Sequence, residues 1–174
     1  RGDVRALKRC VGYVPQVFAL QRDLSVLENL RFTARLHRIP HGVFEERTRD
    51  LLARTALAPF TARPAGALSG GMKQKLALSC ALVHDPRVLI LDEPTTGVDP
   101  LSRRQFWEIL FSLKRSGSAV LVSTPYMDEV SLADRAVLVH QGKKLAEGTP
   151  AEISRRFQGS LFRLKREPTV ELMK

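Results

Sequence analysis

Apolar residues along this chain follow two patterns, short continuous runs and longer stretches with helical spacing. The continuous runs predict strands at four places: Val11–Val14, Val88–Leu91, Ala119–Ser123 and Ala136–His140. Pro15 stops the first of them, because proline cannot donate to a sheet ladder. The run Val88–Leu91 contains no polar residue, which is typical of a strand that a parallel sheet buries on both faces.

Stretches with helical spacing lie between these runs. Ser25 and Glu28 form a capping box that opens an amphipathic helix, which ends before Pro40. Further helices are predicted at four places: Val43–Ala56, Gly71–His84, Leu101–Ser116 and Tyr126–Leu132. Gln141–Lys144 is expected to form a hairpin turn. The alternation of strands and helices predicts an α/β fold, with a helical subdomain where helices crowd residues 24–81.

Composition and charge narrow the class of protein. A chain of 174 residues that is 44% apolar can form one sizeable core. The net charge of +10 comes from basic residues spread along the chain with few aromatic residues between them. This spread does not favour nucleic-acid binding, and an anionic membrane surface or an acidic partner explains the charge about as well. Cys10 and Cys80 show no metal-ligand spacing and fit a reducing compartment.

Two adjacent carboxylates, Asp92 and Glu93, directly follow the most apolar run. At the carboxyl end of a strand in an α/β crevice, the first can hold Mg²⁺ and the second can accept a proton from an attacking water. Phosphoryl transfer needs both roles, because a metal neutralises phosphate charge while a base orients the nucleophile. The alternative is a solvated acidic turn before Pro94.

A second candidate site is the serine-led glycine turn in Leu68–Gln74. Ser69 is a suitable helix N-cap, and Gly70 and Gly71 allow a ligand to approach the backbone closely. The N–H groups of a helix N-terminus favour an anionic phosphate. Such a turn is often only structural, but its combination with Asp92 and Glu93 favours phosphate binding.

These segments resemble motifs of the nucleotide-binding subunit of an ABC transporter: Leu68–Gln74 its signature, Val88–Glu93 its Walker B strand and Gly97–Asp99 its D-loop. The resemblance covers essentially the whole chain. It implies a P-loop NTPase-like (RecA-type) fold, a mostly parallel sheet flanked by helices, with an α-helical signature subdomain. Four parts are expected: 1–16, the end of the core sheet and the Q-loop strand; 17–84, the helical subdomain; 85–157, the remaining ATPase core; and 158–174, a tail or linker.

The resemblance also implies roles for single residues. Glu93 and Gln16 would be catalytic, with Glu93 as the base. Asp92 would hold Mg²⁺, which Gln16 of the Q-loop would sense. The residues that would bind ATP of an opposite subunit, or lie at the seam between subunits, are Ser69, Gly70, Gly71, Gln74 and Asp99. The implied cofactors are therefore ATP and Mg²⁺.

The implied function is ATP binding and hydrolysis that powers export, including multidrug export, at the cytoplasmic face of the cell membrane. The expected partners are a transmembrane ABC subunit and a second nucleotide-binding subunit, with no nucleic acid. Tyr126–Glu129 and Gly148–Pro150 most resemble subunits of ABC-2-type exporters. The alternatives are a degenerate or truncated partner subunit that lends its signature motif to another ATPase site, a non-catalytic interaction module, or an ABC ATPase outside transport.

Two features depart from the family pattern. No G-x-x-x-x-G-K-[ST] loop occurs between Arg1 and Lys174, so Walker A and the N-terminal strands are expected to be absent and this chain alone to be inactive. Pro125 stands where the family has its H-loop histidine, and proline offers no side-chain donor or acceptor to a phosphate. The four histidines, His37, His41, His84 and His140, are expected to be surface or packing residues.

Overall fold

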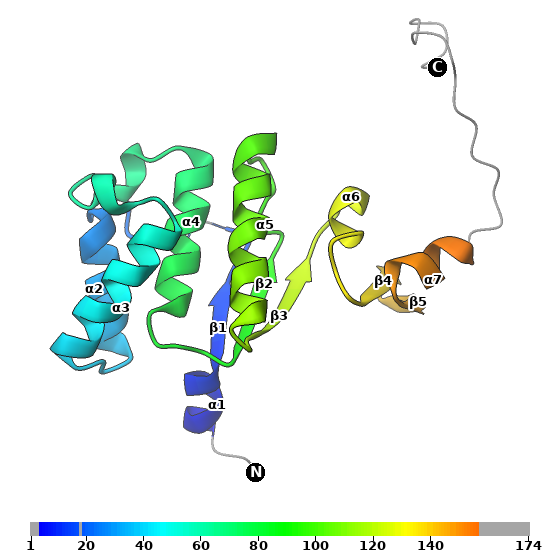
Figure 1. The fold of residues 1–174 in the computed structure, drawn as a ribbon, viewed down its shortest axis with the longest axis horizontal. Coiled ribbons are helices and arrows are strands. Elements are labelled where there is room, and N and C mark those ends of the chain that lie inside the picture. Colours follow the sequence, from blue (N-terminus) through cyan, green and yellow to red (C-terminus); the bar gives the residue numbers. More distant parts are fainter. Residues whose placement is uncertain (1–3, 18, 157–174) are drawn as a thin grey trace, which may run out of the picture. The chain divides into compact units, whose positions relative to one another are not determined.

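The computed structural model describes residues 4–17 and 19–156, which belong to two compact units, a first unit of residues 1–125 and a second of residues 126–174 (Figure 1). The first unit contains α1 (Val4–Cys10), β1 (Val11–Val14), α2 (Val26–Leu36), α3 (His41–Arg54), η1 (Ala58–Phe60), η2 (Ala65–Ala67), α4 (Gly70–Leu82), β2 (Val88–Asp92), α5 (Pro100–Arg115) and β3 (Ala119–Ser123). The second contains α6 (Met127–Val130), β4 (Ala136–His140), β5 (Lys143–Gly148) and α7 (Pro150–Arg155).

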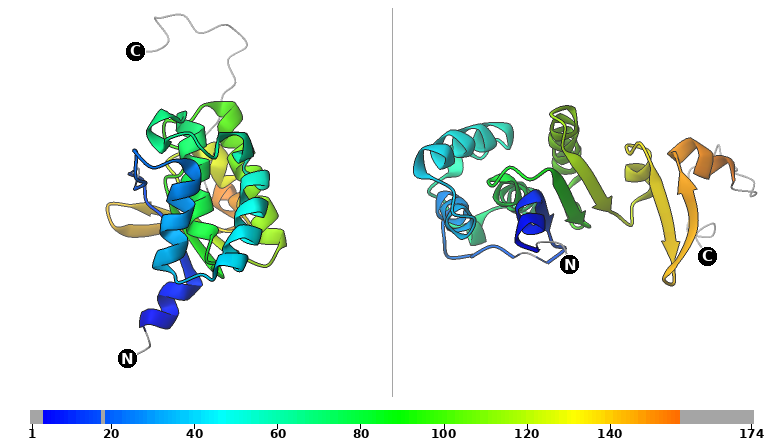
Figure 2. Two further views of the ribbon diagram at one scale, coloured as in Figure 1. Left: turned by 90° about the vertical axis from the view of Figure 1, so that its left-hand side faces the viewer. Right: turned by 90° about the horizontal axis from the view of Figure 1, so that it is seen from below.

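The sheet of the first unit is parallel throughout, with β2 at its centre. Its strand order is β1-β2-β3, and Gly12, Leu89 and Val120 lie side by side in its register. Helices α4 and α5 cover the face that carries these three residues (Figure 2). The predicted α/β fold with a parallel sheet flanked by helices is confirmed.

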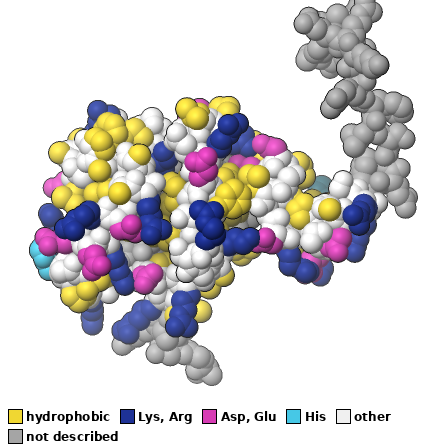
Figure 3. All heavy atoms as spheres, viewed as in Figure 1, with side chains coloured by type: hydrophobic (Ala, Val, Ile, Leu, Met, Phe, Trp, Pro, Cys, Tyr) yellow, Lys and Arg dark blue, Asp and Glu magenta, His cyan; other side chains and the backbone are white. Residues whose placement is uncertain are grey.

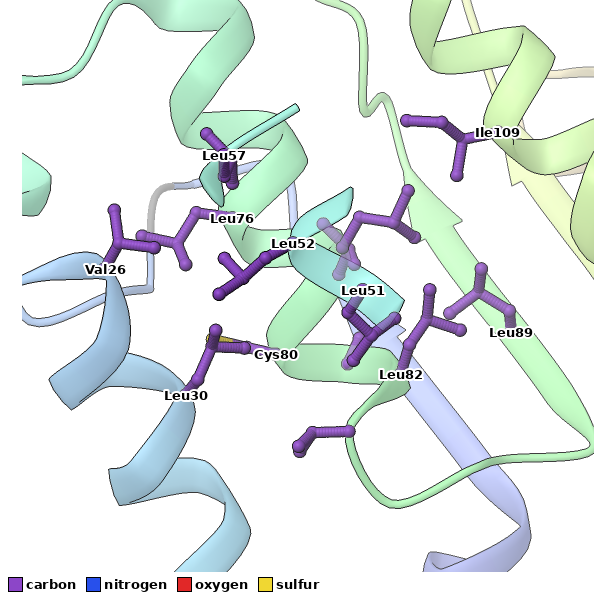
Figure 4. Close-up of a cluster of buried hydrophobic side chains, with 14 of the residues drawn as sticks. Val26, Leu30, Leu51, Leu52, Leu57, Leu76, Cys80, Leu82, Leu89 and Ile109 are labelled. Atoms are coloured by element: carbon purple, nitrogen blue, oxygen red, sulfur yellow. The ribbon is translucent and has the colours of Figure 1, made fainter. Parts of the chain in front are cut away.

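One hydrophobic core joins the sheet to the helices of the first unit (Figure 4). Leu89 and Leu91 of β2 are buried with side chains of α4 and α5. The buried residues of α2 and α3 continue this core on the other side of α4: Val26, Leu30, Ala34, Phe44, Leu51 and Leu52. The predicted helices of residues 24–81 therefore pack around α4, the helix that the serine-led turn opens.

The opposite face of the sheet is only partly covered, which corrects the expectation that β2 is buried on both faces. Val88 and Ile90 are half-buried, whereas Leu89 and Leu91 are fully buried. Tyr13 and Leu121 flank Ile90 in the register and are 55% and 61% exposed. Among the described residues, nothing covers this second face completely.

Local signals set several element boundaries. The capping box that opens α2 is present, because Ser25 accepts from the Glu28 N–H and Glu28 accepts from the Ser25 N–H. The predicted helix Val43–Ala56 begins and ends two residues earlier, at His41 and Arg54. It ends there because Ala56 has a left-handed φ of 56°, which an α-helix does not continue through.

In the second unit, β4 and β5 form an antiparallel pair. Gln141 and Gly142 connect them with positive φ values of 48° and 72°, as a two-residue primed hairpin turn requires. Lys143 and Lys144 already belong to β5, so the turn is narrower than the predicted Gln141–Lys144.

Two observations concern the molecular surface. No helix within the described ranges is both long and apolar enough to cross a bilayer. On the face of the first unit that Figure 3 shows, basic and acidic side chains are interspersed. The net charge is therefore not gathered into one basic patch on this face.

Gly12 lets β1 approach α4 closely, and Gly12→Ala is expected to destabilise the protein by about 1–3 kcal/mol. A Cβ at this position would lie 2.6 Å from the Ala81 carbonyl oxygen and 2.9 Å from Pro86 Cγ. The measurement is urea unfolding followed by the fluorescence of Trp107, the chain's single tryptophan. The control is Gly42→Ala in α3, where a Cβ would meet nothing within 4 Å; equal effects of both substitutions would contradict the prediction.

Candidate phosphate and magnesium site

The carboxyl ends of β1, β2 and β3 meet at one edge of the sheet, because the three strands are parallel and in register. Asp92 is the last residue of β2, Ser123 is the last residue of β3, and Gln16 follows β1 by two residues. Asp92 and Ser123 are direct neighbours in the register. In open α/β sheets this edge is where ligands bind.

Glu93 is held by three other residues at this edge. Gln16 Nε2 donates to Glu93 Oε2 at 2.8 Å, and Thr96 Oγ1 donates to the same oxygen at 3.1 Å. The Glu93 N–H donates to both the carbonyl oxygen and the hydroxyl of Ser123, at 3.1 Å and 3.0 Å. Glu93 has a left-handed φ of 45°, so these contacts hold the backbone in a conformation that non-glycine residues rarely adopt.

Asp92 lies beside Glu93 with a different partner. Its Oδ1 accepts a short hydrogen bond of 2.6 Å from Ser123 Oγ, and both carboxylates are half-buried. Mg²⁺ prefers oxygen ligands and is commonly bound by one or two carboxylates plus substrate phosphates. Within the described part of the chain, no group of three or more His, Cys, Asp or Glu residues is placed to hold a metal. The two carboxylates therefore fit the protein's share of a Mg²⁺ site whose remaining ligands would be substrate phosphates and waters.

The N-termini of α4 and α5 form a second cluster. Ser69 caps α4 by accepting from the Met72 N–H at 3.3 Å, and both Ser69 and Gly70 are exposed. Asp99 caps α5 by accepting from the Ser102 N–H at 2.9 Å. Hydrogen bonds from the Ser102 side chain, and then from its backbone, lower the pKa of Asp99, so its carboxylate stays ionised.

The N-termini of α4 and α5 lie close together at Gly70 and Gly71, which have no side chains. A Cβ on Gly70 would lie 3.7 Å from the Gly97 carbonyl oxygen, and a Cβ on Gly71 would lie 2.6 Å from both Ser102 Cβ and Oγ. The serine-led turn and the segment Gly97–Asp99, which are far apart in the sequence, therefore lie side by side. Exposed backbone at a helix N-terminus can accept an anion.

Gln74 lies in a different environment from the other predicted site residues. It lines a cavity of about 360 Å³ between α2, α4 and β1, together with Val14, Leu20 and Cys80. The exposed tip of α4, by contrast, carries Ser69 and Gly70.

Burial raises the pKa of the Cys80 thiol to about 12, and both cysteines are free, as the sequence predicts.

Pro125 follows β3 by two residues and is exposed. The histidines lie elsewhere: His37 stacks on His84 with ring centroids 3.9 Å apart, and His84 Nε2 lies 3.1 Å from the Val11 carbonyl oxygen. His41 and His140 are exposed. The interpretation of the histidines as packing and surface residues is confirmed.

Three polar residues of these clusters were not identified from the sequence: Thr96, Ser102 and Ser123. Ser123 contacts the carboxylate of Asp92 and the backbone N–H of Glu93, although 30 residues separate it from Glu93. The available signal was its place as the last residue of the predicted strand Ala119–Ser123. Using it required the strand order, which the sequence pattern alone does not give.

Comparisons with known proteins agree with this architecture. A family model described as ABC transporter matches residues 2–96. The chain is 44% identical over 157 residues to the probable multidrug ABC transporter ATP-binding protein YbhF of Escherichia coli (strain K12), covering 90% of this chain and 27% of that protein. It is 39% identical over 153 residues to the Nod factor export ATP-binding protein I of Ralstonia nicotianae, covering 87% of this chain and 48% of that protein.

A solved structure gives the same result. The structure of cbiO1 from Clostridium perfringens, part of the ABC transporter complex cbiONQ, superposes with a TM-score of 0.78 at 28% identity, covering 87% of this chain and 61% of that one. The chain belongs to the ABC transporter family, and its sequence is that of an ATP-binding subunit. It is related to YbhF and to the Nod factor export protein, and spans 27% and 48% of their lengths.

Gly71 should be required for the contact between α4 and α5. Gly71→Ala is expected to destabilise the protein by about 1–3 kcal/mol, because its methyl group would clash with Ser102. Ser102→Gly removes the clashing atoms, so the double variant should recover most of this loss. Thermal unfolding of both single variants and the double variant measures the coupling; strictly additive effects would exclude the proposed steric cause.

Proposed function

We propose that this chain contributes part of the ATP-hydrolysing subunit of an ABC exporter, with ATP as substrate and Mg²⁺ as cofactor. The observation that carries the proposal is the convergence of Gln16, Asp92 and Glu93 at one sheet edge, with Gln16 Nε2 2.8 Å from Glu93 Oε2. An amide donor and two carboxylates at this place suit the activation of water next to a phosphate.

The residues take separate roles in this proposal. Glu93 accepts the proton of the attacking water, and the hydrogen bonds from Gln16 and Thr96 orient its carboxylate. Asp92 supplies the oxygen ligand for Mg²⁺, which when bound neutralises phosphate charge. Gln16 is exposed and contacts Glu93, so it is suited to link the metal site to a transmembrane partner.

The second cluster is assigned to the nucleotide of another subunit. Ser69, Gly70 and Gly71 would offer the exposed N-terminus of α4 to a phosphate, and Asp99 would lie at the seam between two nucleotide-binding subunits. Gln74 is included from the family motif, although it lines the cavity beside β1 and not the exposed tip of α4. The division of the chain into residues 1–16, 17–84, 85–157 and 158–174 is also part of this proposal.

The names of both relatives support a role in transport, and one of them states export. One is called a probable multidrug transporter protein and the other a Nod factor export protein. An exporter subunit would work at the cytoplasmic face of the cell membrane with a transmembrane ABC subunit and a second nucleotide-binding subunit. No nucleic acid is part of this proposal.

Glu93→Gln tests the assignment of the base. Glutamine keeps the size of the side chain but cannot accept a proton, so ATP turnover of the complete transporter should fall by about 10²–10⁴-fold. The measurement is steady-state phosphate release. Glu45→Gln, on the exposed surface of α3, is the control and should leave turnover unchanged. Full turnover in the Glu93 variant would remove Glu93 from this role.

A second candidate function follows from Pro125. Proline offers no side-chain hydrogen bond to a phosphate, so the site formed by Asp92 and Glu93 would turn over slowly while Ser69 serves a competent partner site. In this version the chain is a degenerate partner subunit.

Pro125→His should then raise hydrolysis at this chain's own site by about ten-fold or more, because an imidazole supplies the missing donor. Single-site turnover in the complete transporter, with the other site disabled, is the measurement. Pro125→Ala is the matched control, because it removes the proline ring without adding an imidazole. A rise in neither variant, or an equal rise in both, would count against the degenerate-site candidate.

A further inference from the structure

We propose that Ser123 is the positioning residue that fixes both carboxylates of the sheet edge in their working geometry. This inference rests on the proposed ATP hydrolysis, in which Asp92 and Glu93 have separate roles. Ser123 itself needs no contact with the nucleotide, since its effect passes through these two residues.

One hydroxyl connects Ser123 to both neighbours. Ser123 Oγ donates to Asp92 Oδ1 at 2.6 Å and accepts from the Glu93 N–H at 3.0 Å. A hydroxyl can do both because it carries one donor and two acceptor lone pairs. The bond to Asp92 is a short bond to a carboxylate, the stronger class of hydrogen bond, so it fixes the rotamer of Asp92.

The contact with Glu93 acts on the backbone. Successive side chains of a regular strand point to opposite faces, so Asp92 and Glu93 in an extended chain would diverge. Glu93 instead has a φ of 45°, a left-handed conformation that non-glycine residues rarely adopt. Its N–H is bound by the Ser123 hydroxyl as well as by the Ser123 carbonyl oxygen at 3.1 Å. The pair of acceptors stabilises the turn in the chain that redirects the Glu93 side chain.

The position of Ser123 separates this role from core packing. Ser123 is exposed at the end of β3, so removing its hydroxyl leaves no cavity in the core. Alanine keeps the Cβ and the backbone acceptor but loses the hydroxyl. Threonine keeps the hydroxyl and suits a strand. Cysteine keeps the shape but is only a weak donor and acceptor.

The test uses the complete transporter subunit with Ser123→Ala, Ser123→Cys and Ser123→Thr. The control is Ser116→Ala, which loses a hydroxyl bond to the Ser112 carbonyl oxygen at the end of α5, away from the carboxylates. Two quantities are measured: amide hydrogen exchange at Glu93 without nucleotide, and kcat and KM for ATP. For Ser123→Ala and Ser123→Cys, exchange should accelerate and kcat should fall, each about ten-fold, with KM unchanged. Ser123→Thr and Ser116→Ala should match the wild type.

The two readouts separate this inference from the proposed function. Unchanged exchange at Glu93 in Ser123→Ala would overturn the positioning role, and so would a fall in kcat that Ser123→Thr does not restore. Faster exchange at Glu93 in Ser123→Ala, together with wild-type exchange in Ser123→Thr, supports the positioning contact. This support does not depend on whether Glu93→Gln lowers ATP turnover, and Glu93→Gln could leave turnover intact. Intact ATP turnover in Glu93→Gln would refute the proposed hydrolytic role of Glu93 and leave the positioning role of Ser123 standing.

Discussion

The parallel pairing of β2 with β1 and β3 is the constraint on which the candidate site depends. Backbone hydrogen bonds fix the register, so that Asp92 lies opposite Ser123 and Gln16 emerges beside them. None of these polar side chains is close to another in the sequence except Asp92 and Glu93. Their meeting is produced by apolar residues such as Leu89 and Leu91, whose burial under α4 and α5 holds β2 in the sheet. The burial of apolar side chains in the core therefore determines which polar side chains meet at this edge of the sheet.

The contact of α4 with α5 provides the second constraint, and it links the two clusters. Asp99 and the strand end at Asp92 belong to one continuous segment, whereas Ser69 comes from the helical part of the chain. Because Gly71 has no side chain, the N-terminus of α4 can pack directly against Ser102 in the first turn of α5. A shift of α4 against the sheet would therefore change the position of Ser69 relative to Asp99.

Much of the fold was predictable because its signals are local. The bounds of β1, β3 and β4 and the capping box of α2 follow from residues within a few positions of one another. Two kinds of feature were not predictable. The half-exposure of Ile90 depends on which elements cover the second face of the sheet, and a continuous apolar run carries no information about that. The contacts of Ser123 depend on strand order, and the left-handed Glu93 has no sequence signal, because glutamate is not a residue that favours such a conformation.

The difference between Ser123 and Pro125 bears on how the two sites divide the work. Ser123 contacts the Asp92 carboxylate and the Glu93 backbone N–H, while Pro125 offers no polar side chain to the same edge. In the proposed function, these contacts would keep Asp92 and Glu93 ordered for a metal, whereas position 125 would lack the histidine that helps to stabilise a departing phosphate. The exposed turn at Ser69 is built independently, by an N-cap and two glycines in contact with α5. Under the proposal of a degenerate site, the absence of a histidine at position 125 would slow the chain's own site and leave the turn at Ser69 available to a partner subunit.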